Sequence, residues 1–139
     1  MKYLGLDLGT KTLGTALSDQ KGVLAFFNET LFFKNEDYHS LLPKLKEIIE
    51  EEKIDKIVLG LPKNMNNTLG EAAERCLNFK KILEEEFHKE VIMQDERLST
   101  KEASTYMIEA DCSRKMRKKK IDGLAATIIL QTYLDRKGE

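Results

Sequence analysis

The chain has 139 residues, of which 41% are hydrophobic and 34% are charged, and its formal net charge is −1. These values predict one globular domain, residues 1–139, and exclude a membrane protein, since no stretch approaches the roughly 18 consecutive apolar residues of a spanning helix. No signal-peptide pattern precedes the first apolar segment, so we expect a cytoplasmic protein with reduced cysteines.

The first third of the chain predicts three strands. They cover residues 2–8, 13–18 and 23–33, where apolar residues either run together or alternate with polar ones. The breaks between them are only a few residues long, and such short turns connect antiparallel neighbours. We therefore expect an antiparallel meander.

The rest of the chain alternates between helical and strand patterns. The expected elements are a helix over 41–49, a strand over 57–61, a helix over 69–87, a strand over 91–93, a helix over 99–108 and a final helix over 124–132. Such alternation implies right-handed parallel crossovers. The predicted fold is α/β, with a five-stranded mixed sheet of three antiparallel strands followed by two parallel ones, flanked by helices.

Asp7 stands inside the first predicted strand, within the apolar run over residues 3–10. Strand interiors are poor in Asp, and a carboxylate in apolar surroundings costs free energy unless its charge is compensated. The compensation can be a buried hydrogen bond, a cation from elsewhere in the chain or a metal ion. A simpler interpretation makes Asp7 a residue of the following turn.

Two further carboxylates are expected near Asp7. Glu96 follows the last predicted strand, and Asp122 stands at the start of the last predicted helix. Carboxylates about 5 Å apart repel by roughly 3 kcal/mol per pair at an effective dielectric constant of about 20, so such a cluster needs protons or cations. Carboxylates select Mg²⁺ or Mn²⁺, and two such ions suit attack of water on a phosphodiester. Alternatively, Glu96 pairs with Arg97 at the surface and Asp122 complements the helix dipole.

Positive charge is concentrated in residues 114–120, which we call the basic segment. It carries six of the positive residues of a nearly neutral chain, Arg114, Lys115, Arg117, Lys118, Lys119 and Lys120. Such a concentration favours a surface that faces a polyanion. The alternative is a solvated loop.

Several short motifs, taken together, resemble one known family. They are residues 4–11, 14–19, 60–62, 95–100 and 119–122, with Ala125, Ala126, Ile129 and Leu130 after them. In this order they are similar to the YqgF family, described as pre-16S ribosomal RNA nucleases and earlier as Holliday junction resolvases. The resemblance covers essentially the whole chain. It implies a ribonuclease H-like fold, and it implies that Asp7, Glu96 and Asp122 are the metal-binding acidic trio.

The chain also departs from that family. Thr12 stands where members often carry Arg, and Asn66-Asn67 stands where they usually show Asp-Gly. Asn tolerates left-handed backbone angles, so the loop's shape can survive with one charge fewer. Lys11 could supply the basic contact near Asp7.

Together these features predict a metal-dependent nuclease. Asp7, Glu96 and Asp122 would be both catalytic and metal-binding, holding two Mg²⁺ or Mn²⁺ ions at the scissile phosphate. The expected nucleic-acid contacts are Lys11, Arg97, Arg114, Lys115, Arg117, Lys118, Lys119 and Lys120. The basic segment lacks aromatic residues, so we expect no strong base stacking there.

Several alternatives stay open at this point. The favoured substrate is RNA, in maturation of the 5′ end of pre-16S rRNA within a ribosomal precursor particle. A DNA four-way junction is the second substrate, and its symmetric cleavage needs a two-fold dimer, so the chain is expected to be a monomer or a homodimer. Other classes are a non-catalytic nucleic-acid or ribosome-associated binding module and an actin-like or sugar-kinase-like ATPase.

Overall fold

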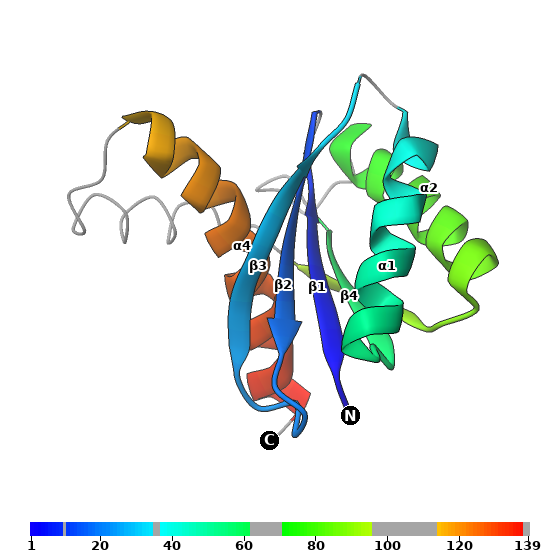
Figure 1. Cartoon of the computed structure of the whole chain (residues 1–139), viewed down its shortest axis with the longest axis vertical. Coiled ribbons are helices and arrows are strands. Elements are labelled where there is room, and N and C mark those ends of the chain that lie inside the picture. The colour runs from blue at the N-terminus through cyan, green and yellow to red at the C-terminus, as the bar shows by residue number, and fades with distance from the viewer. Residues whose placement is uncertain (10, 35–36, 62–70, 96–113, 138–139) are drawn as a thin grey trace.

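The computed structural model of the chain describes residues 1–9, 11–34, 37–61, 71–95 and 114–137, with only the backbone described at 71, 72, 95 and 114–124. Its centre is a five-stranded sheet (Figure 1). The strands are β1 (Tyr3–Leu8), β2 (Thr12–Ser18), β3 (Ala25–Phe32), β4 (Lys56–Leu61) and β5 (Val91–Asp95), in the spatial order β3-β2-β1-β4-β5. Neighbours among β1, β2 and β3 are antiparallel, whereas β4 pairs in parallel with both β1 and β5. The predicted mixed sheet is confirmed.

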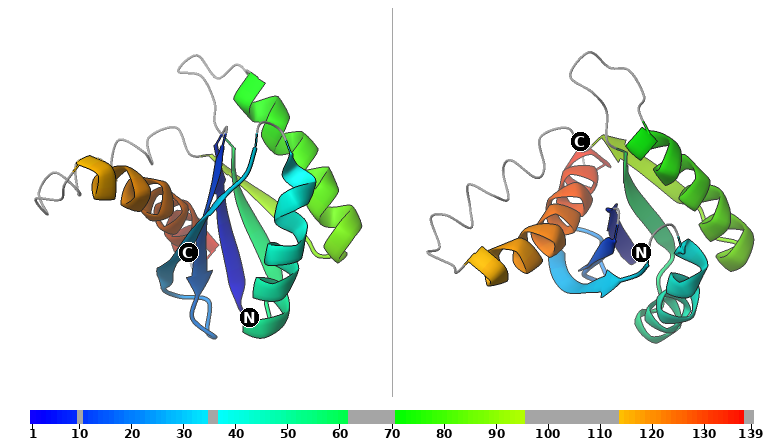
Figure 2. Two further views of the ribbon diagram at one scale, coloured as in Figure 1. Left: turned by 45° about the horizontal axis from the view of Figure 1, so that its top comes forward. Right: turned by 90° about the horizontal axis from the view of Figure 1, so that it is seen from above.

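Helices cover both faces of this sheet (Figure 2). The described helical elements are the 3₁₀ turn η1 (Tyr38–Leu41), α1 (Leu42–Glu52), α2 (Glu71–Phe87) and α4 (Arg114–Lys137). α1 and α2 lie on one face and α4 crosses the other. The helix predicted over 99–108 falls outside the described residues. Within the described part of the chain, no helix is both long and apolar enough to cross a bilayer.

The two faces of β1 supply two different cores. Leu4, Leu6 and Leu8 point into the larger core, where they meet apolar residues of α1 and α2 such as Leu45 and Phe79. This core forms because apolar side chains alternate along the strand and recur at helical spacing in α1 and α2.

The smaller core lies between the sheet and α4. Tyr3 of β1 packs there with Ala126, Leu130 and Leu134 of α4. Gly5 allows the close approach, since a Cβ atom at this position would lie 2.7 Å from Leu130 Cβ and 3.2 Å from the carbonyl oxygen of Ala126. The chain direction of α4 opposes that of β1. Tyr3 packs against Tyr133 in a tilted arrangement with ring centroids 5.6 Å apart, whereas Gly5, later in β1, contacts Leu130 and Ala126, earlier in α4.

The predicted starts of the last helix and of the third strand were wrong. The last helix begins at Arg114 instead of residue 124, because Lys, Arg and Met are strong helix formers even where no apolar pattern marks the helix. Strand β3 begins at Ala25 instead of residue 23, because the backbone N–H groups of Val23 and Leu24 donate to the Asp19 carboxylate at 2.7 and 3.2 Å. Those two amides thus belong to the β2–β3 turn.

Candidate functional site

Asp7 lies inside the ladder between β1 and β2, where it pairs directly with Gly14. The interpretation of Asp7 as a turn residue is therefore wrong. Its side chain is half-buried. Successive strand residues point to opposite faces, so Asp7 shares the face of Gly5, which α4 covers, and points away from the leucine core. The strand thus presents a carboxylate on the α4 side near its C-terminal end.

Glycines flank Asp7 on both neighbouring strands. Gly14 is its partner on β2, and on β4 the pair of Leu6 with Leu59 puts Gly60 beside Asp7 at the next position. Neither residue brings a side chain to this row of the sheet. One row nearer the start of β1, the same face holds apolar Ala16 and Val58. Along β1, this face is therefore apolar near the start of the strand and carries a carboxylate between two glycines near its C-terminal end.

The outer strands add polar residues to the same row. Thr30 of β3 pairs with Gly14, and Gln94 of β5 pairs with Gly60. Gln94 is buried, and its Oε1 accepts a hydrogen bond from Arg136 Nη1 at 3.4 Å. This row could not be predicted from the sequence, because it depends on the register between strands that are distant in sequence. Gln94 lies one residue past the strand predicted over 91–93, which extends to Asp95 in the structure.

The turn after Asp7 is tied to the end of β3. The backbone N–H of Gly9 donates to the carbonyl of Thr12 at 2.8 Å, and the N–H of Phe33 donates to the carbonyl of Lys11 at 2.9 Å. Lys11 is exposed. The predicted contact residue Lys11 therefore lies at the same end of the sheet as Asp7.

The other two predicted acids are described less fully. Glu96 follows β5 directly and falls outside the described residues, as does Arg97. Asp122 lies on α4 with only its backbone described, about two turns after the helix begins, so its predicted place at the helix start was wrong. The first turns of α4 extend past the edge of the sheet beside β3 (Figures 1 and 2). Within the described residues, no three His, Cys, Asp or Glu side chains form a group that could hold a metal ion. The acidic trio stays a prediction.

The basic segment forms the first turns of α4. The expectation of a loop is therefore wrong, since the backbone of the segment is helical. Further along the chain, α4 contacts β3, β2 and β1. The six positive residues thus sit on the helix that covers the Asp7 face.

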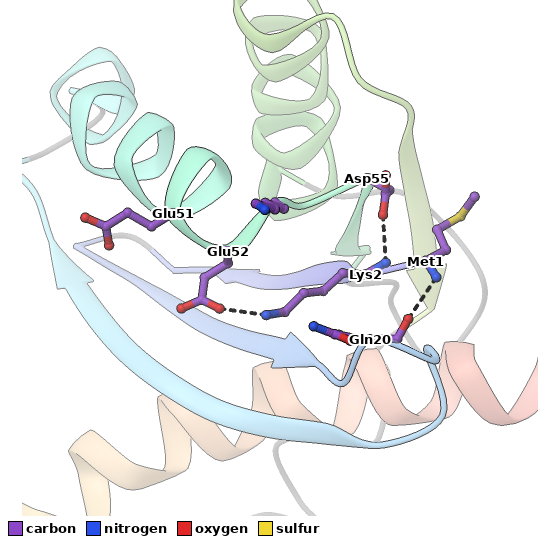
Figure 3. Close-up of a pocket in the computed structure, with 7 residues that line it drawn as sticks. Met1, Lys2, Gln20, Glu51, Glu52 and Asp55 are labelled. Atoms are coloured by element: carbon purple, nitrogen blue, oxygen red, sulfur yellow. Dashed lines mark hydrogen bonds and ion pairs between the residues drawn. The ribbon is translucent and has the colours of Figure 1, made fainter.

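A separate pocket of about 400 Å³ lies at the opposite end of the sheet (Figure 3). It is lined by Met1, Lys2, Gln20, Glu51, Glu52, Lys53 and Asp55. The Nζ of Lys2 donates to Glu52 at 2.7 Å, and the backbone N–H of Lys2 donates to Asp55 at 2.9 Å. These acids hold the start of β1 in place, so they do not form a second cluster like the predicted trio.

The shifted pKa values also belong to that opposite end. Burial raises the pKa of the Tyr3 hydroxyl. A hydrogen bond from the Val23 N–H lowers the pKa of Asp19, and a hydrogen bond to Glu90 raises the pKa of Lys56. All three groups lie at or next to strand ends remote from Asp7, and their shifts follow from local structure.

Comparisons with known proteins agree with this architecture. A family model described as RuvX, Holliday junction resolvase, matches residues 1–136. A protein of Geobacillus sp. (strain WCH70), named "Putative pre-16S rRNA nuclease", is 53% identical over 137 residues, covering 99% of this chain and 99% of that protein.

Two solved structures share the fold at low sequence identity. The T. thermophilus RuvC in complex with Holliday junction substrate has a TM-score of 0.60 at 15% identity, over 99% of this chain and 96% of RuvC. The Fowlpox virus resolvase in complex with Holliday junction DNA has a TM-score of 0.62 at 14% identity, over 100% of both chains. The expected ribonuclease H-like class of fold is confirmed.

The family match and the 53% identical relative cover nearly the whole chain. They confirm the resemblance drawn from the short motifs and the expected enzyme class, a nuclease that hydrolyses phosphodiester bonds. The chain belongs to the RuvX Holliday junction resolvase family.

Proposed function

We propose that this chain is a divalent-metal-dependent endonuclease in which Asp7, Glu96 and Asp122 hold two Mg²⁺ or Mn²⁺ ions. The observation that carries the proposal is Asp7 itself, a half-buried carboxylate inside a strand with glycines on both neighbouring strands. Hard cations prefer carboxylate oxygens, and the missing side chains at Gly14 and Gly60 suit the approach of ions and a phosphate. When bound, the two ions supply activation of a water and stabilisation of the leaving oxygen.

The topology supports a meeting of Asp7 with Glu96. β1, β4 and β5 run in parallel, so their C-terminal ends share one edge of the sheet. β5 is two strands from β1, which is about 10 Å at the usual spacing between strands. Side chains that extend from Asp7 and from the residue after β5 can bridge this distance over β4, where Gly60 leaves the row open.

The packing of α4 supports the third ligand. The Ala126 carbonyl lies against Gly5, and Asp122 comes one turn earlier on a helix that runs against β1. One helical turn advances about 5.4 Å and two strand residues advance about 6.6 Å. The step from Ala126 to Asp122 thus parallels the step from Gly5 to Asp7, and we propose that Asp122 faces Asp7 across this gap.

The other predicted residues would bind the substrate. We propose that Lys11, Arg97 and the basic segment hold phosphates on either side of the cleaved bond. Six positive residues within seven positions of one helix are spread around its circumference, so the segment acts as a charged rod. Backbone charge and shape would then guide recognition more than base identity.

We propose RNA as the substrate, at the 5′ end of pre-16S rRNA in a cytoplasmic ribosomal precursor particle, with residues 1–139 acting as one domain. This substrate is supported by the name of the 53% identical relative, "Putative pre-16S rRNA nuclease". A second candidate is a DNA four-way junction, favoured by the description of the family and by the junction complexes of the two solved structures. A junction needs two active sites related by a two-fold axis, whereas trimming of one RNA strand needs only a monomer.

One experiment tests the active site and the substrate together. Wild type, Asp7→Asn and the control Asp37→Asn, an exposed aspartate before η1, are incubated with Mn²⁺ and either precursor 16S RNA or a four-way DNA junction. We expect Asp7→Asn to lose at least the roughly 10- to 100-fold that loss of a metal's outer-shell partner costs, and Asp37→Asn to keep full activity. Full cleavage by Asp7→Asn would refute the assignment.

Calorimetry with Mn²⁺ separates the enzyme from a non-catalytic binding module. The trio predicts metal binding that Asp7→Asn weakens and Asp37→Asn leaves intact. A wild-type chain that binds nucleic acid without binding Mn²⁺ and without cleaving either substrate would be a binding module. Sedimentation of the wild type gives the oligomeric state in the same buffer.

A further inference from the structure

Strand β3 exposes an unusual amount of aromatic surface. It is an edge strand, and Phe26, Phe27 and Phe32 are 53%, 50% and 64% exposed. Phe32 is the most exposed large apolar side chain among the described residues. Exposed aromatic rings gathered on one edge indicate an interaction site.

The register places Phe32 close to the candidate active site. Phe32 pairs with Thr12, one row beyond the row that contains Thr30, Gly14 and Asp7. Because Phe32 and Thr30 are two residues apart on one strand, Phe32 lies on the same face as Asp7. Two strand spacings and one two-residue step separate Phe32 from Asp7, which amounts to about 12 Å.

The surroundings of Phe32 carry positive charge. The hydrogen bond from the Phe33 N–H to the Lys11 carbonyl brings Lys11 beside the end of β3, and Lys34 follows in the chain. Both lysine side chains are exposed. Glu29, an acid of β3, lies 3.9 Å from Lys44 of α1, on the other face of the sheet. An exposed ring at a sheet corner that also carries two exposed lysines complements a nucleotide, with a base for the ring and phosphates for the lysines.

We propose that Phe32 is a stacking platform for an unpaired base of the nucleic acid bound at Asp7, with Lys11 and Lys34 holding the adjacent phosphates. The proposal rests on the proposed nuclease function and adds a requirement for single-stranded substrate beside the cleaved bond. At about 3.4 Å per stacked nucleotide, 12 Å corresponds to about three or four nucleotides. Stacking tolerates any base, which fits recognition by charge and shape.

A second copy of the chain is the rival occupant of this edge, and the structure disfavours it. The Thr15 hydroxyl accepts from the Glu29 N–H at 3.0 Å and donates to the Glu29 carbonyl at 2.6 Å. The β2–β3 register shifts at this point, and such a bulge interrupts the regular edge that a strand partner needs. Two copies paired about the middle of β3 would also bring their Glu29 carboxylates together.

The test uses the absence of tryptophan from the sequence. Phe32→Trp introduces a single fluorescent reporter at the platform, and Phe26→Trp introduces one on the same strand but on the opposite face, where residue 26 pairs with Leu17. Each variant is titrated with a short single-stranded oligoribonucleotide without divalent metal, so that binding is measured apart from cleavage. We expect quenching in Phe32→Trp, little change in Phe26→Trp, and weaker quenching by a duplex of the same sequence.

Alanine variants supply the affinity. Stacking of one base corresponds to about a 5- to 140-fold change in Kd, and we expect the lower part of this range for Phe32→Ala, with Phe26→Ala within about twofold of wild type. Equal losses in both variants, an unquenched Phe32→Trp with oligonucleotide bound, or no binding by the wild type would each overturn the platform. A wild-type dimer that Phe32→Ala dissociates would also overturn it, in favour of a second copy. If Phe32→Trp is quenched by the oligonucleotide but the wild-type chain cleaves neither substrate, the nuclease proposal is refuted and the platform is retained.

Discussion

The contact between Gly5 and α4 provides the sharpest test of how the fold supports the site. In Gly5→Ala the new Cβ would lie 2.7 Å from Leu130 Cβ and 3.2 Å from the carbonyl oxygen of Ala126. Both atoms are fixed to the helix, so no side-chain rotation can relieve the contact and α4 itself must move outward. We expect the destabilisation of an overpacked core, about 1 to 3 kcal/mol in the free energy of unfolding.

Thermal unfolding followed by circular dichroism measures this effect. For a chain of 139 residues, about 1 kcal/mol corresponds to roughly 3 °C, so Tm should fall by about 3 to 10 °C. Thr132→Ala, on the exposed side of α4, is the matched control and should shift Tm far less. An unchanged Tm in Gly5→Ala would refute the close packing of α4 on β1.

The same variant also tests the proposed place of Asp122. If α4 carries a ligand toward Asp7, moving the helix outward should lower the cleavage rate well below Tm, where the chain is folded. Quenching of a reporter at position 32 should persist, because β3 holds that residue independently of Leu130. Cleavage at the wild-type rate by a Gly5→Ala chain with a lowered Tm would argue against Asp122 as a ligand.

Two further predictions follow from charge. Replacing lysines 118–120 by alanine should flatten the dependence of log K on log salt by about 0.7 to 0.9 per lost phosphate contact, and an unchanged slope would show that these lysines stay in solvent. Asp19 accepts hydrogen bonds from Val23 and Leu24 that lower its pKa below the ordinary 3.8, so its ionised form stabilises the folded chain above that pH. Asp19→Ala should therefore lower Tm at pH 7, the gap to wild type should narrow as the pH falls below 3.8, and a gap independent of pH would contradict the assignment.

The sheet could be predicted from the sequence because its signals are local. Alternation and apolar runs mark β1, β2 and β4 within six or seven residues each. The start of α4 could not be predicted in this way, because its first turns are charged on all sides and carry no apolar period. The start of β3 depends on one carboxylate, Asp19, that takes two amides out of the ladder.

The candidate site shows the same division. Asp7 could be found from the sequence, because a carboxylate inside an apolar strand is conspicuous without knowledge of its neighbours. Gly14 and Gly60 belong to motifs of the family resemblance, but their place beside Asp7 could not be predicted, since it depends on the register between the strands. In the sequence alone Phe32 is an ordinary residue of a predicted strand, because only the strand order shows that β3 is an edge.

The C-terminal half of α4 contacts the sheet, whereas its first turns carry the positive residues, and this arrangement affects how the site is positioned. Gln131 in the C-terminal half accepts from the Ala25 N–H and donates to the Val23 carbonyl, both at 2.9 Å, and Lys137 lies over the Tyr3 ring at 5.5 Å. The basic segment occupies the other end of the same helix. Because α4 is one continuous helix, these contacts at its C-terminal half also fix the orientation of the turns that contain Asp122 and the basic segment. The packing of Gly5 against Leu130 and Ala126 fixes the distance between α4 and β1, and with it the position of the helix backbone at Asp122.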